Sequence, residues 1–110
     1  MENYAVEIRS TFPTREQAVA VGEKAVELHL AACAQISGEI LSIYRWKDSI
    51  CNSSEFRLVL KTMKKKEAEL ISWLTENHPY EVAEIVSTPF SNTSPEYLAW
   101  MQQVTINLPR

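Results

Sequence analysis

The stretch ILSIYRW, residues 40–46, has large apolar side chains on both faces of the strand that it predicts. One parity gives Ile40, Ser42, Tyr44 and Trp46, and the other gives Leu41, Ile43 and Arg45. A strand with one face in water alternates apolar and polar residues, and this one does not. We therefore expect both faces of the strand to be buried.

The residues on either side of this strand predict an alternation of strands and helices. Hydrophobic periodicity and turn residues give, in order, a strand at 4–12, a helix from 14 to near 29, strands at 31–46 and 56–62, a helix at 64–77, a strand at 81–88 and a short helix at 96–104. Thr14 and Gln17 have the spacing of a capping box, and Gly38 suggests a bend or bulge. Residues 47–55 are rich in turn formers, and residues 81–88 are expected to form a core strand.

This order, β-α-β-β-α-β with a C-terminal helix, predicts one ferredoxin-like α+β domain over residues 1–110. Its antiparallel sheet has both long helices on one face, so the other face needs a cover. A large exposed apolar patch is rare on a monomer, and we therefore expect a homo-oligomer. The alternative is that the C-terminal helix, with Leu98, Trp100 and Met101, folds over that face instead.

Composition indicates an ordinary soluble domain and argues against several classes of function. The chain has 110 residues, 45% hydrophobic and 23% charged, with a net charge of −3, which gives no positive field for nucleic acid or anionic lipid. No apolar stretch approaches the roughly 20 residues of a membrane span, and the first residues do not resemble a signal peptide. Cys33 and Cys51 form no CxxC motif, which favours reduced thiols. We expect a cytoplasmic protein without nucleic-acid or membrane partners.

The residue pattern favours binding over catalysis. Only two glycines occur, so no glycine-rich loop is available to cradle a phosphate. Neither histidine stands beside an evident nucleophile, and no Cys/His spacing matches a zinc motif. We expect no enzymatic activity.

His78, in NHPYEVAEIV at residues 77–86, has two interpretations. Pro79 disfavours helical geometry at the preceding residue, so His78 is expected to end the helix at 64–77, near the negative end of its dipole. Imidazole is also a good ligand for copper and related ions, and a metal site shared between subunits stays open.

A second constellation consists of aromatic and charged residues near strand ends or on the last helix. Its aromatic residues are Tyr44, Trp46, Tyr80, Tyr97 and Trp100, with Glu55, Lys61, Glu81 and Glu84 nearby in sequence. Glu84 shares strand parity with Val82 and Val86, and a carboxylate on an apolar face needs a partner, for which Lys61 is a candidate. One interpretation is a structural ion pair at a subunit interface. The other is an aromatic-walled ligand cleft.

Several motifs together resemble the CutA family of divalent-cation tolerance proteins. LAACAQISGEILSIYRW at 30–46 is similar to that family's long-strand motif, LVLKT at 58–62 to its Leu-x-x-Lys-Thr strand, HPYEVAEI at 78–85 to its His-Pro-Tyr-Glu turn and YLAW at 97–100 to its last helix. The resemblance runs from about Val6 to Trp100 and keeps the order and spacing of the motifs.

The resemblance implies a homotrimer with PII-like architecture, intersubunit clefts and a role in tolerance to copper or another divalent cation. It implies His78 as a metal ligand, and it implies a set of residues around the cleft: Tyr44, Trp46, Lys61, Tyr80 and Glu84. The chain departs from the family at two possible ligand positions, where Ser10 replaces a cysteine and Asn77 replaces a second histidine found in some members. Asp48 replaces a hairpin glycine and Ala83 replaces a proline.

Three alternatives to metal tolerance stay open on this fold. The first is a PII-like sensor that holds a small organic ligand in the intersubunit clefts. The second is an RNA-recognition module with stacking aromatics, against which the acidic balance argues. The third is a hydrolase of the acylphosphatase type, whose characteristic loop is missing here.

Overall fold

The computed structural model describes residues 3–106 and has the predicted order of elements. The elements are β1 (Ala5–Phe12), α1 (Arg15–Glu27), β2 (Cys33–Trp46), β3 (Ser49–Met63), α2 (Glu67–Asn77), β4 (Ile85–Pro89) and α3 (Pro95–Val104), with a 3-10 turn at Lys64–Lys66 before α2. The single domain predicted over residues 1–110 stays a prediction, and residues 1, 2 and 107–110 lie outside the described part.

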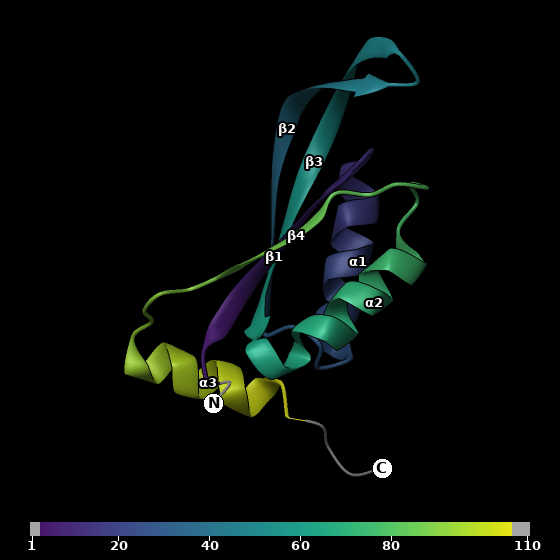
Figure 1. The fold of residues 1–110 in the computed structure, drawn as a ribbon. Coiled ribbons are helices and arrows are strands. Elements are labelled where there is room, and N and C mark those ends of the chain that lie inside the picture. Colours follow the sequence, from purple (N-terminus) through teal and green to yellow (C-terminus); the bar gives the residue numbers. More distant parts are fainter. Residues whose placement is uncertain (1–2, 107–110) are drawn as a thin grey trace.

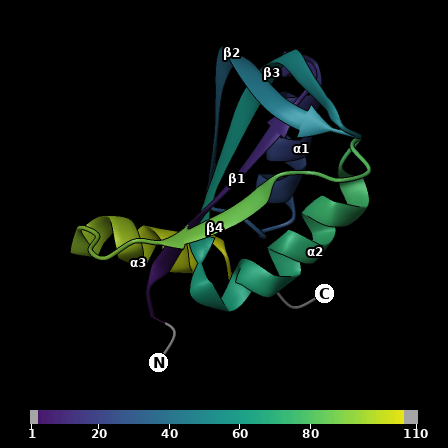
Figure 2. The same ribbon diagram turned by 45° about the horizontal axis from the view of Figure 1, so that its top comes forward.

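The four strands form one antiparallel sheet in the order β2-β3-β1-β4, and α1 and α2 lie together on one side of it (Figure 2). The main core fills the space between the sheet and these helices, with Ile8, Phe12 and Leu58 among its fully buried side chains. The predicted α+β ferredoxin-like fold is confirmed. Within residues 3–106, no helix has the length and apolar character needed to cross a membrane.

Most helix ends lie within two residues of the prediction; α2 begins at Glu67, three residues later than predicted, because Lys64–Lys66 form a 3-10 turn. The Thr14 hydroxyl accepts the backbone N–H of Gln17 at 3.1 Å and begins α1. The helix ends at Glu27, two residues earlier than predicted, because His29 turns to a positive φ of 62°. The α2 helix ends at Asn77, before Pro79, as predicted.

The prediction of a long turn at residues 47–55 is wrong. β2 and β3 stay paired up to Trp46 and Ser49, and only Lys47 and Asp48 form the turn. Both have positive φ values, 49° and 67°, as in the tight turns that match the twist of a hairpin. The polar residues 51–54 pair with β2, and this pairing overrides their weak strand propensity.

The β2–β3 hairpin therefore extends well beyond the rest of the sheet (Figure 1). β1 ends at Phe12, opposite Phe56, so residues 49–55 of β3 pair only with β2. We call residues 40–55 the arm. The register of the β2–β3 pairing shifts between Ser37 and Ile40, just before the arm, which confirms the bulge predicted at Gly38.

The prediction of a core strand at residues 81–88 is wrong in length and in burial. β4 begins at Ile85, pairs only with β1 and forms an edge of the sheet, with Val86 exposed. The pairing with β1 stops at the Ser10–Ile85 pair, and residues 81–84 run outside the sheet. Among residues 3–106, no strand pairs with residues 81–84, so they are not buried as a core strand would be.

The α3 helix covers only one end of the second sheet face. Met101 packs there with Ala5, Ala32 and Met63, at the end of the sheet far from the arm (Figure 1). The apolar residues of the arm stay open: Leu41 is 67% exposed, and Ile43 and Ile50 are each 66% exposed. The expected burial of both faces of residues 40–46 is thus not met inside one subunit, and α3 does not supply it.

Candidate functional site

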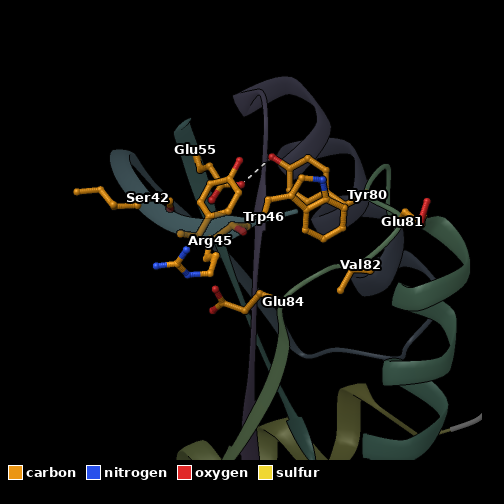
Figure 3. A pocket seen from close by; sticks show the side chains of 11 residues that line it. Ser42, Arg45, Trp46, Glu55, Tyr80, Glu81, Val82 and Glu84 are labelled. Atoms are coloured by element: carbon orange, nitrogen blue, oxygen red, sulfur yellow. Dashed lines mark hydrogen bonds between the residues drawn. The ribbon is translucent and has the colours of Figure 1, made fainter. Parts of the chain in front are cut away.

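A cleft of about 640 Å³ opens where the arm faces the loop between α2 and β4. Its lining comes from three parts of the chain: Thr11 of β1; Ser42, Ile43, Tyr44, Arg45, Trp46 and Glu55 of the arm; and Tyr80, Glu81, Val82 and Glu84 of the loop. Figure 3 shows Ser42 and Arg45 on one side of this cleft, and Tyr80, Glu81 and Val82 on the other.

A partly buried hydrogen bond joins the two walls of the cleft. The Tyr80 hydroxyl donates to Glu55 Oε2 at 2.6 Å (Figure 3), and Glu55 is only 7% exposed. Burial raises the pKa of Tyr80 well above its ordinary value of 10.0, and the hydrogen bond to Glu55 adds to the rise. Tyr80 therefore stays protonated at physiological pH and acts as a donor to a carboxylate.

His78 holds the loop that carries Tyr80. Pro79 ends α2, and the backbone of His78 is extended, which turns its ring onto Phe12 with 4.3 Å between ring centroids. His78 Nδ1 accepts the backbone N–H of Tyr80 at 3.1 Å, so the ring also holds the backbone of Tyr80 in place. His78 thus ends the helix, as predicted, and anchors one wall of the cleft to β1.

The hydrogen bonds of His78 describe a neutral ring. Because Nδ1 accepts from Tyr80, Nε2 carries the proton and donates to Ser10 Oγ at 2.9 Å. Burial lowers the pKa of His78 below its ordinary value, and this effect exceeds the opposing effects of the Thr11 backbone and the Glu55 charge. Both ring nitrogens are occupied inside the subunit.

A metal ion has no ready group of ligands in the described subunit. Among residues 3–106, no three His, Cys, Asp or Glu side chains gather in a way that could hold an ion. A metal bound to His78 must displace either Ser10 or the Tyr80 amide from the ring. Ser10 meets His78 at the position where the resemblance implied a thiolate.

Of the five residues predicted for an intersubunit cleft, four lie together in this cleft of one subunit, and one does not. Tyr44, Trp46, Tyr80 and Glu84 lie in it, whereas Lys61 lies on the sheet face, in register with Cys33 and Glu7. The ion pair expected between Lys61 and Glu84 is not formed among the described residues. β1 separates β3 from β4 in the sheet, and Glu84 precedes β4.

Glu55 is the most buried carboxylate of the cleft, and the sequence alone places it near the aromatic residues without giving it a role. Residues 47–55 were assigned to a turn, where a glutamate needs no explanation. The strand assignment gives the missing signal, because Glu55 pairs with Ile40 at the bulge and its strand continues into the core. A charged residue in such a place needs a partner, here Tyr80.

The cleft has the chemistry of a binding site. It combines three aromatic side chains with several polar groups that can orient a ligand. The Tyr44 hydroxyl is hydrogen-bonded to Ser53 across the arm at 2.7 Å, which holds that aromatic wall in place.

Comparison with known proteins identifies the family. The family model described as CutA1 divalent ion tolerance protein matches residues 6–104. The divalent-cation tolerance protein CutA of Thermotoga maritima is 38% identical over 96 residues, which cover 87% of this chain and 94% of that protein.

A mammalian relative and a solved structure point to the same family. Mouse protein CutA is 38% identical over 95 residues, 86% of this chain, but the match covers only 54% of the mouse protein, so this chain spans about half its length. The crystal structure of CutA1 from Shewanella sp. SIB1 superposes with a TM-score of 0.91 at 31% identity, covering 97% of this chain and 100% of that one. The matched region runs from β1 to the end of α3, and this chain belongs to the CutA1 divalent ion tolerance protein family.

Proposed function

We propose that this chain works as a homotrimer in tolerance to copper or another divalent cation, and that it acts by binding and not by catalysis. The observation that carries the proposal is the family match over residues 6–104, which takes in every strand and helix. Growth in rising copper tests the role. A strain that lacks the gene is expected to lose tolerance and to regain it with the wild-type gene, and unchanged growth would contradict the proposal.

The arm supports assembly. A two-stranded hairpin alone is marginal in water, and this one also carries exposed apolar residues: Leu41, Ile43, Tyr44, Trp46 and Ile50. The outer edge of β2 offers free backbone groups to another chain. A second and third copy that cover the arms satisfy both needs.

We propose His78 as a metal ligand in the assembled protein, with groups from another subunit completing the site. Native mass spectrometry during titration with copper(II) tests this. His78→Ala is expected to lower copper uptake, whereas the matched control His29→Ala, which loses only a hydrogen bond to the Val104 carbonyl, is expected to keep it. Equal uptake by wild type and His78→Ala would refute the role of His78.

A second candidate function is a PII-like sensor of a small organic ligand, and the aromatic-walled cleft favours it. We propose that Tyr44, Trp46, Tyr80 and Glu84 contact this ligand, and that Lys61 joins them from another subunit. Replacing Trp46 or Lys61 by Ala is expected to abolish ligand binding and to leave the trimer and the metal response intact. Loss of the metal response in the same variants would count against a separate sensor.

We propose the cytoplasm as the location of the protein. The net charge of −3 and the two free cysteines support this, although the CutA of Archaeoglobus fulgidus is described as periplasmic. Cell fractionation with an antibody against the chain decides between the two compartments.

A further inference from the structure

We infer that the cleft between the arm and the α2–β4 loop binds an organic cation, a small molecule with an ammonium or substituted ammonium group. The inference rests on the second candidate function, in which this cleft holds a ligand. It adds the chemical class of the ligand, and the charges, aromatic walls and burial of the cleft carry it.

The charges of the cleft favour a cation. Within one subunit, Glu55, Glu81 and Glu84 line it against one basic residue, Arg45. The carboxylates still outnumber the basic groups if Lys61 joins the cleft from another subunit. Figure 3 shows Arg45 on the side of the cleft away from Tyr80 and Glu81. A ligand placed against Tyr80 therefore meets the carboxylate of Glu55 first, and an anionic ligand is repelled there.

The aromatic walls suit a cation as well. Tyr44, Trp46 and Tyr80 present rings to the cleft, and the negative face of an aromatic ring attracts an ammonium group within about 6 Å of its centroid. The structure contains one example of this contact, because Lys47 Nζ lies 5.8 Å from the centroid of the Trp46 ring. The indole of Trp46 is thus placed where a positive charge can reach it.

Glu55 places a negative charge on the wall of the cleft. The carboxylate is 7% exposed and accepts the Tyr80 hydroxyl on Oε2. Within residues 3–106, no Lys, Arg or His side chain forms an ion pair with it. A cation bound in the cleft is therefore attracted by a carboxylate that has no counter-ion in the described subunit.

Geometry separates an organic cation from a metal ion. A metal ion needs several oxygen ligands within about 2.6 Å of one point, and the described carboxylates do not gather in such a group. A substituted ammonium group is several ångströms wide and is recognised by separate carboxylates and ring faces. The spread of the charges around the 640 Å³ cleft fits the larger ligand.

Isothermal titration calorimetry of the full chain tests the inference with two pairs of probes. Choline is compared with its neutral analogue 3,3-dimethylbutan-1-ol, and 2-phenylethylammonium with 2-phenylethanol. Because each pair has nearly the same shape, the positive charge is the main difference. We expect at least one cation to bind at least about tenfold more tightly than its neutral analogue.

Two variants locate the site. Glu55→Gln keeps an acceptor for Tyr80 but removes the charge, and it is expected to weaken binding of the cation at least about tenfold. Glu23→Gln removes an exposed carboxylate from α1 and is expected to leave binding unchanged. If Glu55→Gln does not fold, as judged by circular dichroism, Glu84→Gln takes its place.

The outcomes separate this inference from the functions proposed above. Equal affinity for a cation and its neutral analogue would overturn the charge preference and leave the cleft as a ligand site. Failure of all four probes to bind, or binding that the Glu55 and Glu84 variants leave unchanged, would overturn the inference itself. Copper uptake and subunit mass, measured separately, decide the metal role in either case.

Discussion

His78, Tyr80 and Glu55 form one connected set of contacts that runs from the end of α2 into the cleft. Ser10 accepts the Nε2 proton of His78, His78 Nδ1 accepts the Tyr80 amide, and the Tyr80 hydroxyl donates to Glu55. Each group has the protonation state that its neighbour needs, because His78 is neutral and Tyr80 stays protonated. The stability of these contacts is therefore expected to depend on pH and on the hydroxyl groups that take part in them.

The free energy of unfolding is expected to fall as the pH drops below 6.5, in part through His78. Burial lowers the pKa of His78 in the folded chain below its ordinary value of 6.5, so the unfolded chain takes up the proton first. This contribution is fully present above pH 6.5 and is lost as the pH falls through the folded pKa. Urea unfolding at fixed chain concentration, between about pH 7.5 and about pH 5.5, measures it.

His78→Gln is the control for this pH dependence, because glutamine keeps polar groups at the site and does not titrate. The variant is expected to have a shallower loss of stability over the same pH range. A variant that loses stability as steeply as the wild type would show that His78 does not cause the effect.

Tyr80→Phe is expected to lower the free energy of unfolding by about 1–3 kcal/mol, because the buried Glu55 carboxylate loses its hydroxyl donor. Tyr44→Phe is the matched change, since it removes an exposed hydrogen bond to Ser53 and should cost about 0.5 kcal/mol or less. Urea unfolding compares the two variants. Equal losses would contradict the special role given to the Tyr80–Glu55 pair.

Among the elements, α1 lies so close to the sheet at Gly22 that a larger residue there must displace its neighbours. A Cβ atom at Gly22 would lie 3.0 Å from the Ala34 Cβ and 3.1 Å from Leu58 Cδ1. Gly22→Ala is therefore expected to destabilise the chain by about 1–3 kcal/mol through overpacking, less the gain of about 1 kcal/mol in helix propensity.

The double variant Gly22→Ala/Ala34→Gly tests the cause, because it removes one of the two atoms that crowd the new methyl group. It is expected to be more stable than the sum of the two single changes allows. Urea unfolding of the wild type, the two single variants and the double variant gives the coupling free energy between the two positions. Strict additivity would contradict direct contact between α1 and β2 at this point.

Elements that depend on local chemistry could be predicted from the sequence, and those that depend on pairing could not. Thr14 and Pro79 act on their own neighbours, so the start of α1 and the end of α2 are visible in the chain itself. The strand status of residues 51–54 depends on β2, and the early end of the pairing at Ile85 depends on β1. The residues of one strand do not by themselves show where its pairing with another strand begins and ends.

The same division applies to the candidate site. Tyr44, Trp46, Tyr80 and Glu84 were found through motifs, and all four line one cleft. The sequence shows Glu55 only as a carboxylate near the aromatic residues, because its burial follows from the arm and the loop coming together. Lys61 was a candidate partner for Glu84 because the strand order was not known. Topology, which the sequence shows only indirectly, decides both cases.

At the scale of the whole molecule, the exposed arm is the feature that a single chain leaves unexplained. Ile43→Asp places a charge among its exposed apolar residues and is expected to shift the protein from trimer to monomer. Val26→Asp makes the same kind of change on an exposed part of α1 and is expected to leave the trimer intact. Light scattering after size-exclusion chromatography compares the two variants, and a trimer that survives Ile43→Asp would argue against the arm as the interface.

The subunit number of the wild-type protein decides whether other copies of the chain cover the arm. Native mass spectrometry of the purified protein measures it in one experiment. We expect a main species at three times the chain mass of 12.6 kDa, since the exposed apolar residues of the arm have no cover within the described part of one chain. A main species at 12.6 kDa that stays folded would contradict the claim, because the arm would then be stable in water without a partner.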